Sequence, residues 1–170
     1  MTIAEFPDMK KDLIKRKANY LKNNNFILDP FKIASDYGVP VHFIPLIRPF
    51  AFTARDPMGK PEIYIADDVT DESLQILGYH ELGHVFCEKN YDTSLFNHTI
   101  DHESEFTANM FMLQFLPEVL RNNTLNENTD IRAINRYVGL KIRRRNNDPL
   151  QGINQDIFDF IDINNPFWII

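Results

Sequence analysis

The feature that constrains this chain most is the pentapeptide His80-Glu81-Leu82-Gly83-His84, which has the pattern H-E-x-x-H. On a helix, residues four apart lie one turn apart on the same face, so the two imidazoles point to a common position. Zinc accepts neutral imidazole nitrogens and prefers four ligands in a tetrahedron. Glu81 lies roughly 100° further round such a helix, where its carboxylate reaches a water on the open side of the ion and acts as a general base. Five residues alone do not exclude two surface histidines that fall four apart by chance.

The neighbouring residues predict that the pentapeptide is helical. Thr70 is a candidate N-cap residue, and the acids Asp71 and Glu72 complement the positive end of a helix dipole. We expect this helix to run through both histidines to about Lys89. Both imidazoles are then on one helical face, which favours a metal site over unrelated surface residues.

A hydrolytic zinc site needs three protein ligands and one open position. A second helix is expected from Asp101, as its cap, to about residue 116. On it, Glu105 and Asn109 share a face, so the carboxylate is a candidate ligand and the amide a candidate partner for the other nitrogen of a ligand imidazole. Glu103 is the rival ligand. The alternative interpretation of either acid is a first-turn carboxylate favoured by the helix dipole.

The rest of the chain predicts short strands and helices without repeats or low-complexity linkers. We expect helices over 7–22, 29–37, 70–89 and 101–116 and after Thr129, with Asp29 and Thr129 as further candidate caps, and strands within 39–47, 50–54 and 61–68. This order favours one α+β domain over residues 1–170. Pro61 lacks the N–H that a central strand needs, so the third strand is expected at a sheet edge. Substrate-binding residues are expected there, through main-chain pairing with an extended peptide: Ile63, Tyr64, Ile65 and Ala66.

The quoted motifs resemble the ImmA/IrrE family of zinc metallopeptidases, of the phage or mobile-element type. The resemblance covers about residues 28–117. It consists of "IASDYGVPVHFIP", the aliphatic strand "PEIYIADD", the helix motif "LGYHELGH", and a Glu-x-x-Ala-Asn-x-Phe pattern at 105–111 followed by "QFLP". It implies a zincin-like core, in which a small three-stranded sheet packs on the H-E-x-x-H helix and a second helix carries a ligand. A C-terminal helical extension follows over about 118–170.

The resemblance also implies roles for individual residues. His80, His84 and Glu105 become the zinc ligands, Glu81 the catalytic base and Asn109 an outer-shell residue. The implied activity is that of a zinc-dependent endopeptidase that cleaves a DNA-binding repressor with a helix-turn-helix domain and so relieves repression.

A second pair of histidines repeats the four-residue spacing. His98 precedes the expected helix cap at Asp101, so His98 and His102 are most simply exposed loop residues. The alternative is that one of them replaces Glu105 as a metal ligand.

Three other kinds of residue were weighed for chemistry. His42 lies on a strand and is expected to be structural or solvent-facing. Cys87 shares a helical face with His84; a buried, inert thiol is the simpler interpretation, and contact with the metal is the alternative. Three tyrosines near the histidine helix in sequence are candidates to stabilise an oxyanion: Tyr64, Tyr79 and Tyr91.

Composition limits the partners. The net charge of −6 argues against a surface built for nucleic acid or an anionic membrane. The single cysteine excludes an intramolecular disulfide, and no signal peptide or membrane span is recognisable, so we expect a cytoplasmic protein. Two alternative classes stay open: an antirepressor or toxin–antitoxin partner that keeps a structural metal, and a DNA-associated regulator using residues 129–147. For the basic run 141–145, a solvated helix surface is the simpler interpretation.

Overall fold

A computed structural model describes residues 1–88 and 101–146 of the chain. Its elements are α1 (Asp8–Asn24), α2 (Pro30–Asp36), β1 (Val41–Ile44), β2 (Ala51–Arg55), β3 (Pro61–Ala66), α3 (Asp71–Cys87), α4 (His102–Phe115), the 3-10 helix η1 (Pro117–Leu120) and α5 (Ile131–Gly139). The α+β class is confirmed for the described residues. The extent of the domain over 1–170 stays a prediction, because His98, Tyr91 and the apolar C-terminus lie outside the described residues.

The helices begin where side chains accept the first free backbone N–H groups. Asp29, Thr70 and Asp101 each accept such bonds at the starts of α2, α3 and α4, as expected. The expectation of a cap at Thr129 is wrong, because Asp130 caps α5. The Thr129 hydroxyl instead accepts a backbone N–H in the preceding turn.

The sheet has the order β1-β3-β2, with β1 parallel and β2 antiparallel to β3. Strand β3 forms main-chain hydrogen bonds along both of its sides. The N–H of Ile63 donates to the carbonyl of Pro40 on the β1 side, and the N–H of Ala66 donates to the carbonyl of Phe50 on the β2 side. The third strand in sequence is therefore the central strand in space.

The expectation that Pro61–Ala66 forms an edge strand is wrong. Pairing with β1 begins only at Ile63, opposite Val41, so Pro61 lies beyond the end of β1 and its missing N–H costs no ladder bond. Because both sides of β3 are paired, main-chain pairing of a substrate with residues 63–66 is not available. Among the described strands, β1 and β2 are the outer ones.

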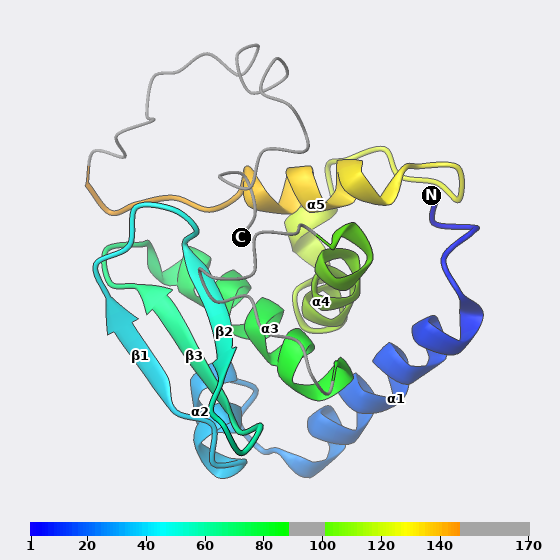
Figure 1. The fold of residues 1–170 in the computed structure, drawn as a ribbon. Helices are drawn as coiled ribbons and strands as arrows, with labels where there is room; N and C mark the ends of the chain where they lie inside the picture. Colours follow the sequence, from blue (N-terminus) through cyan, green and yellow to red (C-terminus); the bar gives the residue numbers. More distant parts are fainter. Residues whose placement is uncertain (89–100, 147–170) are drawn as a thin grey trace.

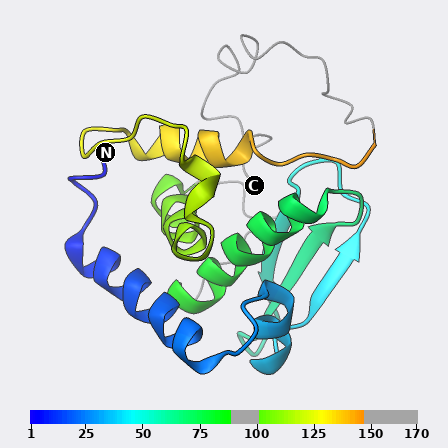
Figure 2. The same cartoon turned by 180° about the vertical axis from the view of Figure 1, so that it is seen from behind.

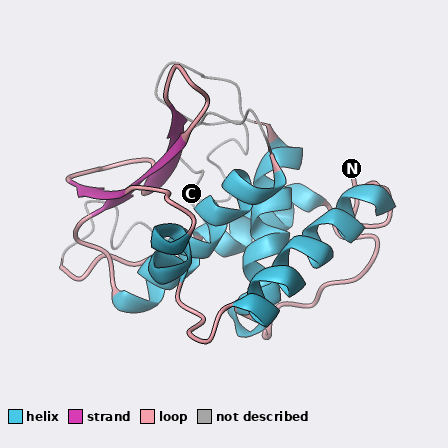
Figure 3. Cartoon of the chain, turned by 90° about the horizontal axis from the view of Figure 1, so that it is seen from below, coloured by secondary structure: helices cyan, strands magenta, loops and turns pink. Residues whose placement is uncertain are grey.

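Helix α3 is the centre of the molecule. The sheet covers one side of α3, and α1, α4 and α5 lie on the other side, as the front and rear views agree (Figures 1 and 2). A view along another axis shows the same segregation of strands and helices (Figure 3). On the sheet side, Ile63 and Ile65 of β3 are fully buried, and Ile76 and Leu77 of α3 belong to the same core. The pentapeptide is thus enclosed by apolar layers.

Helices α3 and α4 are in close contact at Gly83. A Cβ at this position would lie 2.8 Å from the Cα of Ala108 and 3.1 Å from the Cβ of Phe111. Only the absence of a side chain permits this contact, because backbone atoms cannot move aside cheaply. The glycine at position 83 of the motif therefore allows α4 to pack close to the helix that carries the two histidines.

The basic run 141–145 follows α5 and is not helical. The backbone N–H of Arg143 donates to the hydroxyl of Ser73 at 2.7 Å, and Arg144 pairs with Asp68. The Arg144 side chain is only 4% exposed. The expectation of a helix here is therefore wrong, whereas the expectation of a solvated surface holds for Lys141, Arg143 and Arg145, which are exposed. Arg144 is the exception, and the run links the start of α3 to the loops beside it. Within the described ranges, no helix is both long and apolar enough to cross a membrane.

Candidate metal centre

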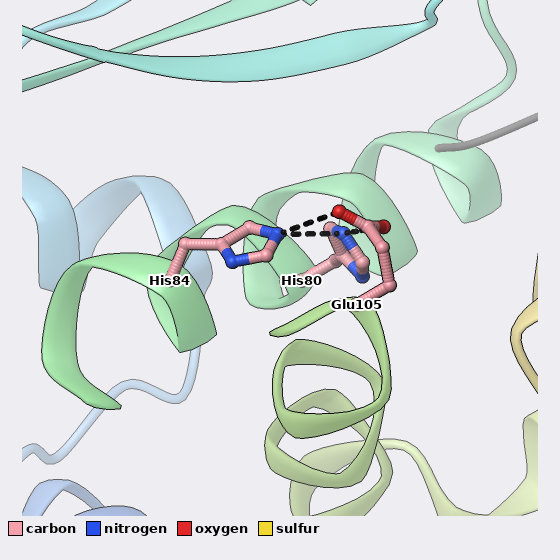
Figure 4. A group of neighbouring side chains, drawn as sticks. All are labelled: His80, His84 and Glu105. Carbon is pink, nitrogen blue, oxygen red and sulfur yellow. Dashed lines mark hydrogen bonds and ion pairs between the residues drawn. The ribbon is translucent and has the colours of Figure 1, made fainter. Parts of the chain in front are cut away.

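Three buried side chains from two helices meet at one point. His80 and His84 come from successive turns of α3 and Glu105 comes from the first turn of α4 (Figure 4). The Nε2 atoms of the histidines are 3.2 Å apart, and they lie 3.2 and 3.3 Å from the two carboxylate oxygens of Glu105. These three residues form the one cluster in the described chain with the geometry of a metal site.

The spacing of the ligand atoms is compatible with a small tetrahedral cation. Ligand atoms bound to zinc at ~2.1 Å are separated by about 3.4 Å along a tetrahedral edge. The two Nε2 atoms are 3.2 Å apart, each lies 3.2 or 3.3 Å from a different oxygen of Glu105, and one ligand atom from each of the three residues lies within 4.8 Å of the others. Two imidazoles and a carboxylate form a donor set that zinc accepts in catalytic sites with an open fourth position. The same set also accepts other divalent metals.

Asn109 forms a hydrogen bond with the imidazole nitrogen of His80 that faces away from the cluster. Its Oδ1 lies 2.7 Å from His80 Nδ1, the nitrogen that points away from Glu105. Asn109 is buried one turn after Glu105 on the same face of α4, as the spacing of the two residues predicted. A bond of this kind fixes the rotation of a ligand imidazole.

Glu81 is buried beside the cluster and is held by the sheet. The hydroxyl of Thr53, in the middle of β2, donates to Glu81 Oε2 at 2.6 Å. At the end of the same strand, the guanidinium of Arg55 donates to the carbonyl of Glu88 at 2.8 Å. Strand β2 is thus tied both to the carboxylate and to the end of α3. Sequence reasoning missed Thr53, because nothing local in "FAFTA" reveals which helix the strand packs on.

Burial and mutual contact shift the pKa of every ionisable group here. Burial raises the pKa of Glu81 to about 7. Burial opposes protonation of His80, but the hydrogen bond and charge of Glu105 outweigh it and raise the pKa of His80 to about 9. Burial lowers the pKa of His84 to about 4. Although burial opposes it, contact with the two histidines holds the pKa of Glu105 well below its ordinary value.

The shifted pKa of His80 predicts how strongly zinc stabilises the protein at different pH values. In the metal-free fold, the pKa of His80 lies above its ordinary value of 6.5. Protonated His80 therefore contributes fully to stability below that pH, and this contribution is lost as the pH rises through about 9. Zinc must displace this proton, so we expect zinc affinity to rise about tenfold per pH unit between pH 7 and 9. The increase in Tm on adding zinc should therefore grow across this range. Thermal melts with and without zinc at fixed free metal test this, and an increase that shrinks toward pH 9 contradicts it.

The rival ligand and the second histidine pair lie elsewhere. Glu103 is part-exposed, and its carboxylate forms a 3.1 Å ion pair with Lys10 of α1. His102 is the first residue of α4 and does not belong to the cluster, and its partner in the sequence motif, His98, lies outside the described residues.

Two of the candidate tyrosines, Tyr64 and Tyr79, lie within the described residues, and both are engaged in packing. The ring of Tyr64 stacks between His42 and Phe52, and its hydroxyl donates to Glu62 at 2.9 Å. These residues lie on the face of the sheet opposite to the buried Thr53. Tyr79 stacks on Phe115 of α4. Burial raises the pKa of the Cys87 thiol to about 12, in keeping with an inert cysteine, and Cys87 is not among the clustered ligands.

Comparison of the chain with protein-family models, with curated proteins and with solved structures finds no match. The geometry of the described residues shows a buried His-His-Glu cluster on two helices, consistent with a zincin-like site.

Proposed function

We propose that this chain is a zinc-dependent endopeptidase. His80, His84 and Glu105 hold the ion and Glu81 is the catalytic base. The observation that carries the proposal is the meeting of three buried ligand residues, whose ligand atoms lie within 4.8 Å of one another, beside a second buried carboxylate that Thr53 orients. A site needed only to bind a structural metal has no use for that second carboxylate, which costs free energy to bury.

Each residue has a defined task in peptide hydrolysis. A zinc ion at this site supplies a Lewis acid that lowers the pKa of a bound water and polarises the scissile carbonyl. Glu81 accepts the proton of the attacking water and passes it to the leaving amine. Burial of Glu81 beside the three ligand residues places its carboxylate where a base is needed. Asn109 keeps the ring of His80 in its binding orientation.

We further propose a DNA-binding repressor as the natural substrate. The support is the resemblance of residues 28–117 to the ImmA/IrrE motifs. The test compares cells that produce the wild-type chain with cells that produce Glu81→Gln, by labelling all new protein N-termini. The proposal expects wild-type-specific termini in a protein with a helix-turn-helix domain, and new termini only in unrelated proteins overturn it.

The function itself is tested with the purified protein. We expect about one zinc per chain by elemental analysis, and zinc-dependent cleavage of a mixed peptide library that stops on chelation and returns on adding zinc. Bound zinc without cleavage of any peptide or of any protein in the cell would leave a binding module, such as an antirepressor, as the correct class.

A further inference from the structure

A chain of hydrogen-bonded amide groups leads from the metal centre to helix α5. His80 Nδ1 lies 2.7 Å from Asn109 Oδ1, and Asn109 Nδ2 donates to Asn135 Oδ1 at 2.9 Å. Asn135 Nδ2 in turn donates to the backbone carbonyl of His102 at 3.0 Å. These three hydrogen bonds connect α3, α4 and α5. We call the hydrogen-bonded chain from His80 through Asn109 and Asn135 to the His102 carbonyl the amide relay. Asn135 is its only member on α5.

The end of the relay determines its direction. An asparagine amide can be turned either way, since its oxygen and nitrogen have nearly the same shape. A backbone carbonyl, however, only accepts hydrogen bonds. Asn135 must therefore turn its Nδ2 toward His102, which leaves its Oδ1 facing Asn109. Asn109 must then present Nδ2 to Asn135 and Oδ1 to the imidazole.

The direction of the relay selects the tautomer of His80. Because Asn109 presents an oxygen, His80 Nδ1 must carry the proton and donate it. In the neutral ring the lone pair then lies on Nε2, the atom that faces Glu105 at 3.2 Å. If Asn109 were reversed, its Nδ2 would favour a lone pair on Nδ1 and a proton on Nε2, and the ring could not bind a cation at the cluster.

We propose that Asn135 is a positioning residue of the metal centre, which acts through Asn109 to hold His80 in its metal-binding tautomer. The proposal rests on the proposed metal site and adds to it a residue on α5 that touches none of the ligands. The position lies 26 residues beyond Asn109 in the chain, in a stretch where no motif marks it.

The main test is a double-mutant cycle on metal affinity. Asn135→Leu removes the relay's anchor at similar volume, and we expect zinc affinity to fall by about tenfold, the lower end of the effect of outer-shell partners. In an Asn109→Asp background the same change should have little effect, because a carboxylate accepts from Nδ1 whichever way it is turned. Affinity is measured by competition with a chromophoric chelator. Equal losses in both backgrounds indicate a merely structural role and overturn the proposal.

The tautomer is measured directly by nitrogen NMR of histidine-labelled, metal-free protein at an alkaline pH, where the ring of His80 is neutral and no bound ion fixes the position of its proton. The wild-type chain should show a proton on His80 Nδ1 and a lone pair on Nε2, and Asn135→Leu should show a mixture of both tautomers. An unchanged spectrum in Asn135→Leu overturns the proposal. Asn135→Asp keeps the oxygen that faces Asn109, so it is expected to retain the wild-type spectrum and serves if the leucine variant does not fold.

The proposed metal site and the proposed relay can be refuted independently of each other. If the wild-type chain binds no zinc, the proposed metal site is refuted, and the relay is still tested in the metal-free protein. There the resonance of the His80 Nδ1 proton should be protected from exchange in the wild type and lost in Asn135→Leu. Equal protection in both proteins overturns the relay whatever the metal result.

Discussion

Replacing Glu105 by alanine is expected to abolish stoichiometric zinc binding, whereas replacing Glu103 by alanine leaves it intact. Glu105 supplies one of three ligand atoms and the only negative charge among them. Zinc sites in small domains are worth about 10–16 kcal/mol over their ligands, so one ligand corresponds to an affinity loss on the order of 10² to 10³-fold. The neighbouring acid Glu103 is part-exposed and points toward Lys10 instead of the cluster.

The two alanine variants form a matched pair, because they remove the same group from the same turn of α4. Zinc content after dialysis and affinity by chelator competition are the measurements. Glu105→Ala also removes a buried carboxylate between two histidines, so the melting temperature of each metal-free variant is recorded to show that it folds. Equal zinc content in both variants would place the third ligand elsewhere and withdraw the endopeptidase proposal.

Replacing Glu81 by glutamine is expected to reduce peptide cleavage by about 10² to 10⁴-fold, the range of general acid–base catalysis, while zinc binding is retained. Glutamine keeps the shape of the side chain and can accept the bond from Thr53, but it cannot take a proton from water. The loss should appear in kcat, since Glu81 acts in the proton transfers and not in binding the peptide.

Glu88 provides the control for this substitution. It lies at the end of the same helix, is part-buried, and burial likewise raises the pKa of its carboxyl to about 7. Glu88→Gln therefore makes the same chemical change outside the ligand cluster, and cleavage should persist. If Glu81→Gln cleaves as fast as the wild type with zinc bound, another group is the base. If Glu81→Gln supports full biological function without cleavage, the chain is a binding module.

The features that sequence reasoning found are those determined within a few residues of the chain. Caps at Asp29, Thr70 and Asp101 depend on side chains that bond N–H groups two or three residues on, so they are visible locally. The shared faces of His80 with His84 and of Glu105 with Asn109 follow from helical periodicity alone. That the two helices pack with these faces together was inferred from chemical need and from the resemblance.

The features that sequence reasoning missed depend on contacts between distant segments. The central place of β3 follows from the order of three strands, which the local signal of Pro61 misrepresents. Thr53 contacts Glu81 across 28 residues, and Asn135 reaches Asn109 from a separate helix. Arg144 is in a basic run typical of a solvated surface, yet its pairing with Asp68 places it inside the fold. Without the strand order and helix packing, none of these partners is visible.

The strap formed by residues 143–145 bears on how far the protein can be shortened. The backbone of Arg143 accepts from Thr70 and donates to Ser73, and the N–H of Arg145 donates to the carbonyl of Asp68. A version cut after α5 would lose these bonds and uncover the first turn of the histidine-bearing helix, far along the chain from the cut. Expression vectors for a minimal active fragment should therefore place the stop codon no earlier than position 146.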